Sequence, residues 1–350
     1  MNQGKKLIIH AGMPKTGSSS IQDTLFHTLN ASTSIKYVPF GSSNHCALYQ
    51  LLTNDDPLKY HGFSKHGFTI EQLNSRKQAA TKKFIEFCSD LKGLAVFSAE
   101  DVAGPSSEAQ LANFHMILES VALDYEFVIY IRPPFSFMDS AFQEGVKGGD
   151  ITRWLPQGAW PSYRRRIEPI LNIFGRDRVT LIPYCLDEFP SGDVTLHFAK
   201  LIDLDLDKSQ IRKSNQSLSL EALSLIYLQR KYGSGLETGN PKAPARNLRW
   251  ALCLDQLGTC KFAYSDRIRN EVLKNNMDDV LWIESKLGCN LRDTSSGNVV
   301  RIDSEEDLVK IAISVAPQVM RILKDIASTS VPTSDVSQIA AALEAIRLLG

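Results

Sequence analysis

A glycine-bearing turn, set between a short apolar run and a helix-like segment, constrains the fold of this chain most strongly. Residues 7–11 read LIIHA, and a buried run this short is typical of a strand. The turn GMPKTG follows at 12–17, and Ile21, Leu25 and Leu29 then recur at helical spacing after three serines. Backbone N–H groups of such a turn converge with the positive end of the helix dipole on one point. The pattern therefore predicts a phosphate-binding loop near the N-terminus.

The same alternation of apolar runs and helix-like segments continues through the first half of the chain. Further strands are predicted at 34–38, 94–98, 127–131 and 179–184. Helices are predicted at about 71–92, 107–123 and 162–174, with another after Arg132-Pro133-Pro134. Short apolar strands that alternate with helices indicate a parallel sheet covered on both faces. We therefore expect an α/β fold, a three-layer α/β/α arrangement around a central parallel sheet of about five strands.

From about residue 191 onward the pattern is helical, so C-terminal helices should follow the sheet. Ser304 to Asp307 resembles a capping box that opens a helix, which Pro317 should kink or split. A last amphipathic helix is expected at about 335–349. These features predict a core at 1–230, a helical continuation with a long acceptor-side loop at 231–292, and a C-terminal helical extension at 293–350.

The position of the lysine separates this loop from the ordinary nucleotide-binding loop, GxxxxGK[ST]. Gly12 and Gly17 keep the glycine spacing, but Ser18 stands where the lysine belongs and the lysine is Lys15, inside the loop. A kinase or other NTPase needs a lysine after Gly17 and an aspartate at a strand end that binds the metal. The lysine is missing here, which counts against a kinase or NTPase, and that class stays the main alternative. The alternative to a phosphate-binding loop is a turn at 12–17 that only connects the strand to the helix.

A second anion site is predicted at the end of another strand. Arg132 follows FVIYI, and Ser140 lies eight residues further on, in the helix expected after Pro134. The arginine can offer two N–H donors to a phosphate, and the serine hydroxyl can offer a third. An arginine at a strand end is by itself more often a solvated cap, so this prediction depends on its combination with the loop.

These two motifs together resemble a known family. GMPKTGSSSIQ is similar to the 5′-phosphosulfate-binding loop of sulfotransferases that use 3′-phosphoadenosine-5′-phosphosulfate (PAPS), with Ser18 and Ser19 in the places of two threonines. The family also has an arginine, a proline two residues later and a serine at the spacing of Arg132, Pro134 and Ser140. The segments FSAED and NQSLSLEAL look like bacterial carbohydrate-type sulfotransferases. The resemblance covers about 7–230 and is specific at the first two motifs.

The resemblance implies a P-loop NTPase-like enzyme that moves a sulfuryl group from PAPS to an acceptor hydroxyl or amine and releases 3′,5′-ADP. It implies that the loop and the start of the helix bind the 5′-phosphosulfate, through Lys15, Thr16, Gly17, Ser18, Ser19 and Ser20. Arg132 and Ser140 would bind the 3′-phosphate, and Lys15 would neutralise the leaving oxygen. No metal is expected, because the transferred group carries less charge than a phosphoryl group. A non-catalytic nucleotide-binding relative is a further alternative.

A later basic segment, RKSNQS at 212–217, is a weaker candidate for the 3′-phosphate site. Cytosolic members of the resembled family use an Arg-Lys-Gly loop for this purpose, which makes Arg212 and Lys213 candidate ligands. Here Ser214 follows the lysine in place of the glycine. A solvated basic turn is the alternative interpretation.

Two residues compete for the role of the general base that takes the acceptor's proton. His45 lies after the predicted strand at 34–38, and Glu100 follows the strand at 94–98. Both should face the crevice at the carboxyl ends of the parallel strands. An imidazole, with an ordinary pKa of about 6.5, needs no tuning, whereas a glutamate, at about 4.3, must have its pKa raised by burial. Chemistry favours His45 and position favours Glu100, so the choice stays open.

The acceptor and the setting of the protein are predicted from weaker signals. The loop at 147–160 joins glycines to Trp154 and Trp160, which suits a carbohydrate or glycan-like acceptor; packing of both tryptophans under the loop is the alternative. The 39 basic and 39 acidic residues cancel, which argues against a nucleic-acid partner. No apolar run reaches the ~18 residues that a membrane span needs, so we expect a cytoplasmic protein. A homodimer through the C-terminal helices is left open.

Overall fold

The computed structural model describes residues 5–29, 34–64, 66–104, 106–149, 154–212, 217–233, 254, 257–293, 298–327 and 335–349. The chain divides into two compact units. Unit 1 consists of Met1–Pro133, Ser162–Asn215 and Asp278–Arg292, and unit 2 consists of Pro134–Pro161, Gln216–Met277 and Asp293–Gly350. The chain therefore passes between the units several times. The division expected at residues 230 and 292 follows chain order and stays a prediction.

Unit 1 is built on one parallel sheet, whose strands lie in the order β2-β3-β1-β4-β5. The strands are β1 (Lys6–His10), β2 (Ile35–Tyr37), β3 (Leu94–Ser98), β4 (Asp124–Ile131) and β5 (Val179–Pro183). Each lies on one of the five apolar runs of the sequence, which confirms the predicted strands. β1 pairs with β3 on one side and with β4 on the other. The loop after β1 therefore leaves the middle of the sheet at its carboxyl edge, where ligands bind in such folds.

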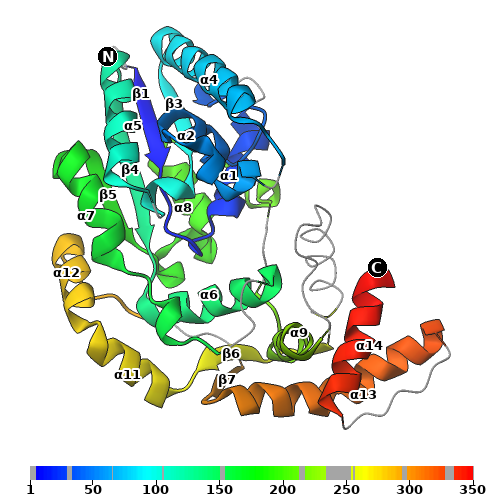
Figure 1. Cartoon of the computed structure of the whole chain (residues 1–350). Helices are drawn as coiled ribbons and strands as arrows, with labels where there is room; N and C mark the ends of the chain where they lie inside the picture. Colours follow the sequence, from blue (N-terminus) through cyan, green and yellow to red (C-terminus); the bar gives the residue numbers. More distant parts are fainter. Residues whose placement is uncertain are drawn as a thin grey trace. The chain divides into compact units, whose positions relative to one another are not determined.

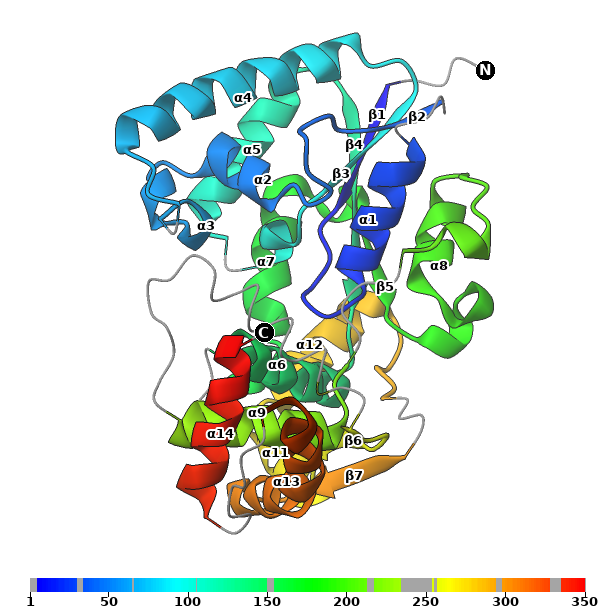
Figure 2. The same cartoon turned by 90° about the vertical axis from the view of Figure 1, so that its right-hand side faces the viewer.

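Different helices cover the two faces of this sheet, because successive side chains of a strand point to opposite sides. On one face, Ile8 and Val128 share a core with side chains of α1 (Ser18–Leu29) and α8 (Val194–Leu201). On the other face, Phe97 and Phe127 meet aromatic rings of three helices, α4 (Ile70–Asp90), α5 (Glu108–Ser120) and α7 (Tyr163–Phe174). Figure 2 shows α1 and α8 on one side of the strands and α4 and α5 on the other. Unit 1 thus has the predicted three-layer α/β/α fold.

Shorter elements complete unit 1. They are the helices α2 (Cys46–Thr53), α3 (His61–Ser64) and most of α12 (Met277–Leu287), and the 3₁₀ turns η1 (Pro57–Lys59), η2 (Glu100–Ala103), η4 (Arg176–Arg178), η5 (Leu186–Glu188), η6 (Pro190–Gly192) and η7 (Lys208–Gln210). The two long helices of the second face begin at capping boxes, Thr69 with Gln72 in α4 and Ser107 with Gln110 in α5. Each box satisfies two backbone N–H groups, which explains why these helices start where they do.

Unit 2 packs helices around a two-stranded parallel sheet. Its elements are α6 (Pro134–Gly148), η3 (Gln157–Ala159), α9 (Leu220–Tyr232), β6 (Lys261–Tyr264), α11 (Asp266–Asn275), β7 (Val299–Ile302), α13 (Glu305–Ala327) and α14 (Val336–Leu349). Almost all residues of α9 are buried, and α13 and α14 pack beside it, as Figure 1 shows. Among the helices described in either unit, none combines the length and apolar character needed to cross a membrane.

One prediction for the C-terminal part of the chain is wrong, and one alternative of a second is excluded. The pattern predicts only helices after about residue 191, but β6 and β7 form a parallel pair there. Each strand has four residues, KFAY and VVRI, and lies among segments with a helical pattern, so neither stands out in the sequence. Pro317 does not split α13, which continues to Ala327, because the side chains around it pack in the core of the unit and offset the missing hydrogen bond; a kink at Pro317 stays a prediction. The predicted helices at both C-terminal positions, α13 and α14, are confirmed.

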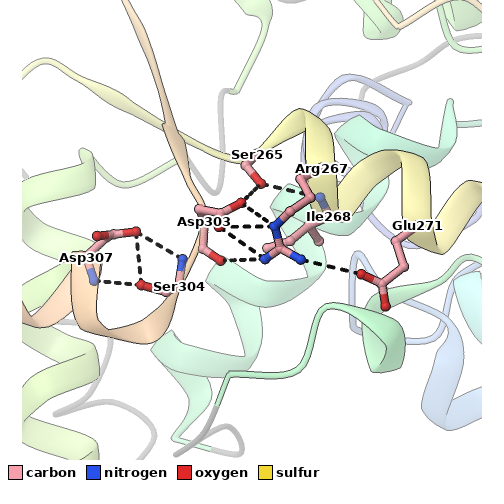
Figure 3. Close-up of polar contacts among 7 residues, drawn as sticks. All are labelled: Ser265, Arg267, Ile268, Glu271, Asp303, Ser304 and Asp307. Carbon is pink, nitrogen blue, oxygen red and sulfur yellow. Dashed lines mark hydrogen bonds and ion pairs between the residues drawn. The ribbon is translucent and has the colours of Figure 1, made fainter.

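A polar network joins the carboxyl ends of β6 and β7 in unit 2, as Figure 3 shows. Nε and Nη2 of Arg267 each lie 3.1 Å from an oxygen of the Asp303 carboxylate, which also accepts a hydrogen bond from the Ser265 hydroxyl. Ser304 and Asp307 form the predicted capping box of α13, with Asp307 N–H donating to Ser304 Oγ at 3.3 Å. The starts of α11 and α13 are therefore tied together where the two parallel strands end.

Candidate functional site

The loop between β1 and α1 departs from ordinary backbone geometry at two residues. Gly17 has a φ of 77°, and a β-carbon there would lie 2.6 Å from Cγ1 of Val194, so only glycine fits. Lys15 has a φ of 72°, a conformation that costs a non-glycine residue about 1–3 kcal/mol. Strain of this kind persists only where the surrounding structure imposes it, and it is common at ligand-binding sites. The loop is therefore held in a special conformation at the lysine that the sequence singles out.

The hydroxyl groups of the loop differ in what they can offer to a ligand. The Thr16 hydroxyl donates to the carbonyl of Met13, 2.7 Å away, and so closes the loop. Ser18 is buried and is the first residue of α1, and Ser19 and Ser20 are half-buried in the same turn. The first N–H groups of a helix have no partner within the helix and are suited to bind an anion. The start of α1 thus has the donors that the sequence predicts.

Gly12 keeps space open between the strand end and the helix start. A β-carbon on Gly12 would lie 2.6 Å from Ser18 Oγ and 2.9 Å from His10 Nε2, closer than real contacts allow. Gly12 does not have a positive φ. Glycine is therefore required here because a β-carbon would not fit, and not because of the backbone conformation. The polar atoms of His10 and Ser18 therefore converge beneath the loop.

The structure brings Arg132 and the loop together. β4 lies beside β1 in the sheet, and the Arg132 guanidinium donates a hydrogen bond to the carbonyl of Lys15, 117 residues away in sequence. The carbonyl of Arg132 in turn accepts from the Tyr163 hydroxyl at 2.6 Å. Ser140 lies on α6 in unit 2, and its pairing with Arg132 stays a prediction. Lys15, which follows β1, and Arg132, which follows β4, are thus both at the carboxyl edge of the sheet.

Tyr184 belongs to this edge and is missed by the reasoning from sequence. It follows β5 directly, and the Arg132 guanidinium lies 5.6 Å from the centroid of its ring. Its hydroxyl is 3.9 Å from the place of a β-carbon on Gly17. Burial raises the pKa of Tyr184, while the charge of Arg132 acts in the other direction. One feature of the sequence could have identified Tyr184. It ends an apolar run that is predicted to be a strand, and residues at the carboxyl ends of parallel strands face the ligand crevice.

The later basic segment contacts α1 through its backbone. The N–H of Arg212 donates to Thr24 Oγ1 at 2.9 Å, and the Arg212 side chain is exposed. Arg212 also lines an open pocket of about 690 Å³ together with His27 and Asp205. Lys213 lies outside the described residues. A role for these two residues in anion binding stays a prediction.

His45 is completely buried and both of its ring nitrogens are occupied. Nε2 lies 3.0 Å from the Val38 carbonyl, and Nδ1 accepts the N–H of Ser98 at 3.0 Å. The nitrogen that faces a carbonyl must carry the hydrogen, so the ring is neutral with its proton on Nε2. Burial lowers the pKa of His45 to about 4. This imidazole joins β2 to β3 and has no lone pair left to accept a proton from a substrate.

Glu100 has different surroundings. It opens η2 directly after β3 and is half-buried. Burial raises the pKa of the Cys46 thiol, and the charges of Asp101 and Glu100 raise it further. Asp101 is engaged by Gln50, whose Nε2 donates to Oδ2 at 3.0 Å. Glu100 is therefore a half-buried acidic residue at the carboxyl edge of the sheet, in the same unit as the loop.

The tryptophans of the 147–160 loop pack in unit 2. Trp154 meets Phe142 and Tyr264 edge to face, with ring centroids 5.2 and 4.9 Å apart, and Trp160 packs against the same core. Residues 150–153 of this loop and the loop at 233–247, apart from Gly233, lie outside the described residues. Among the residues that the structure does describe, no three His, Cys, Asp or Glu side chains are grouped to hold a metal ion.

Comparisons with known proteins find likeness in structure and none in sequence. No family model matches the chain, and no curated protein matches it. A sulfotransferase from Alicyclobacillus acidocaldarius is similar with a TM-score of 0.44 and 13% identity, over 81% of this chain and 96% of that one. The sulfotransferase domain from the curacin biosynthetic pathway is similar with a TM-score of 0.35 and 11% identity, over 83% of this chain and 99% of that one. Both TM-scores lie below 0.5, so function has to be inferred from the site's own residues.

Proposed function

We propose that this chain is a PAPS-dependent sulfotransferase that moves a sulfuryl group to an acceptor hydroxyl or amine. The observation that carries the proposal is the meeting of Arg132 with the Lys15 loop at the carboxyl edge of the sheet. PAPS differs from ATP by a 3′-phosphate and needs two anion sites, one for each end of the nucleotide. The loop with α1 would serve the 5′ end and Arg132 the 3′-phosphate. A lysine inside the loop, in place of one after Gly17, distinguishes this arrangement from a kinase.

The residues at this edge fit such a ligand. Gly12 and Gly17 leave room that a β-carbon would fill, and the start of α1 presents N–H donors. PAPS, when bound, supplies the sulfuryl group. Lys15 would neutralise the charge that gathers on the leaving oxygen as its bond to sulfur breaks. The new bond joins the acceptor oxygen or nitrogen to sulfur, and the acceptor's proton passes to a base.

For that base we propose Glu100 in preference to His45. Glu100 is partly exposed at the carboxyl edge, whereas both nitrogens of His45 are bound to backbone groups. A group must be able to accept a proton before its pKa matters, and His45 has no free lone pair. His45 is then a residue that fixes β2 against β3.

The 3′-phosphate assignment can be tested by titration calorimetry with EDTA present. 3′,5′-ADP should bind at least about tenfold more tightly than 5′-AMP, since hydrogen bonds to a charged group contribute about 1.5–3 kcal/mol. Arg132→Ala should remove most of this difference. Arg164→Ala, which changes an exposed arginine on α7, is the matched control and should leave it unchanged. Equal binding of the two nucleotides by the wild-type protein would refute the assignment.

For the acceptor we propose a carbohydrate or glycan-like molecule, and a cytoplasmic setting without nucleic-acid partners. The support is the pair Trp154 and Trp160, which are half-buried residues of an aromatic type that suits the C–H surfaces of a sugar. A homodimer through the C-terminal helices stays a prediction. Offering sugars, small alcohols and amines to the enzyme separates the acceptor classes, and sulfation of amines or simple alcohols alone would remove carbohydrates from the proposal.

A further inference from the structure

His10 is a buried polar residue that the proposed chemistry does not use. It is the last residue of β1 and has no exposed surface. Nδ1 lies 2.8 Å from Ser98 Oγ, and Phe198 and Tyr130 pack around the ring, with centroids 5.1 and 6.1 Å away. Burial lowers the pKa of His10 to about 3, so the ring is neutral at ordinary pH. One side of this imidazole is therefore fixed to β3 and to the core.

The other side of the ring is unsatisfied. His10 Nε2 is buried and has no hydrogen-bond partner within the structure as described. Leaving a buried polar atom unpaired costs about 1–3 kcal/mol, so such an atom calls for a functional explanation. The space over Gly12 connects Nε2 to Ser18, because the place of a β-carbon there is 2.9 Å from Nε2 and 2.6 Å from Ser18 Oγ.

Ser18 is held loosely in this structure. Its Oγ lies 3.5 Å from Thr16 Oγ1, at the limit of a hydrogen bond. The Thr16 hydroxyl already donates to the Met13 carbonyl, so it has no hydrogen left to give to Ser18. A movement of the Ser18 side chain into the space over Gly12 would pair its hydroxyl with Nε2 of His10. The pair would satisfy both atoms and fix the first residue of α1, where the anion is expected to bind.

We propose that His10 is a positioning residue of the loop, which pairs through Nε2 with the Ser18 hydroxyl when an anion occupies the start of α1. This inference rests on the proposed function, because 3′,5′-ADP is the anion used to test it. The pair connects the loop to Ser98 and, through the Ser98 backbone, to His45. The ends of β1, β2 and β3 thus support the helix start from below.

Two substitutions separate the two sides of the ring. Asparagine places a polar atom near Nδ1 and glutamine places one near Nε2, so His10→Asn keeps the contact to Ser98 and His10→Gln keeps the contact to Ser18. His10→Asn should weaken 3′,5′-ADP binding about tenfold, the loss expected for one hydrogen bond. His10→Gln should stay within about threefold of the wild type. Calorimetry measures both, with thermal unfolding of the free proteins as the check on folding.

A double-mutant cycle tests whether His10 acts through Ser18. Adding Ser18→Ala to His10→Asn should cause little further loss of affinity, whereas Ser19→Ala, the matched control, should add its own loss in full. Additive losses with Ser18→Ala, or His10→Asn binding as tightly as the wild type, would overturn the inference alone. A wild-type protein that does not bind 3′,5′-ADP would overturn the proposed function and this inference with it.

The wild-type protein provides a measurement that does not depend on variants folding. The ¹⁵N resonance of His10 Nε2, assigned by its loss in His10→Gln, should shift when 3′,5′-ADP is added, because the nitrogen gains a hydrogen bond. The Nδ1 resonance should change much less, since its contact to Ser98 is already made. An Nε2 resonance that does not move on saturation with the nucleotide would contradict the proposal.

Discussion

The side chains of His45 and Glu100 follow neighbouring strands of one sheet and have opposite surroundings. Val38 and Ser98 occupy the two nitrogens of His45, and the side chain has no exposed surface. Glu100, in contrast, is only half-buried. A histidine with an ordinary pKa near pH 7 looks like the better base in sequence, but its chemistry is decided by which atoms are free. Residue type alone ranks His45 above Glu100 as the general base, and the hydrogen bonds of His45 reverse that ranking.

Single substitutions should separate structural from catalytic roles. His45→Ala should lower the free energy of unfolding by about 2–4 kcal/mol, because it removes two buried hydrogen bonds and leaves a cavity. Glu100→Gln should leave thermal stability nearly unchanged and lower kcat about 10²–10⁴-fold, the usual contribution of a general base. Glu108→Gln, an exposed carboxylate at the start of α5, is the control for a change of charge. A folded, inactive His45→Ala beside an active Glu100→Gln would reverse these assignments.

The joined ends of β6 and β7 give unit 2 a dependence on acid that can be stated with its sign. Hydrogen bonds from Ser265 and Arg267 lower the pKa of Asp303 below its ordinary value of 3.8. A carboxyl group with a lower pKa in the folded state binds its proton more weakly there than in the unfolded chain. Its stabilisation is therefore complete above its ordinary pKa and is lost as the pH falls through the folded value. Solvent screens the exposed charges, so the effect should be small.

Asp303→Asn should accordingly lower the stability of the protein at neutral pH, and its difference from the wild type should shrink below about pH 4. Urea unfolding between about pH 7 and pH 2 measures this difference. Glu271→Gln removes only a single contact to Arg267, 3.6 Å long and one turn along α11, and should have a smaller effect. A difference between Asp303→Asn and the wild type that stays constant over the whole range would contradict the assignment of the pKa shift.

In the molecule as a whole, the strands of unit 1 can be predicted from the sequence and those of unit 2 cannot. The run LAVFS at 94–98 predicts β3 to the residue, because buried parallel strands are continuous apolar runs. β6 and β7 are missed because each lies among helix-like segments and is defined by its pairing with the other. The passage of the chain between two units is likewise a property of tertiary contacts, which no local pattern contains.

The candidate site can likewise be predicted from the sequence only in part. The order strand, glycine turn, helix predicts the loop at Lys15, and parallel pairing of β1 with β4 explains why Arg132 meets it. The occupied nitrogens of His45 could not be foreseen, because they depend on backbone groups of two other strands. Tyr184 and His10 matter through contacts across the sheet, and although both lie in or beside predicted strands, no local pattern shows those contacts.

Transfer of radiolabelled sulfur from PAPS to a panel of acceptors, with EDTA present, tests the proposed activity. The wild-type protein should label at least one acceptor and release 3′,5′-ADP without added metal. Lys15→Ala should slow this transfer about 10²–10³-fold, the usual loss for one donor that stabilises charge in the transition state. Its affinity for 3′,5′-ADP should change far less, because Lys15 acts on charge that develops only during the reaction. Labelling of no acceptor from PAPS, together with transfer of the γ-phosphate from Mg-ATP, would contradict the proposed activity and identify a kinase.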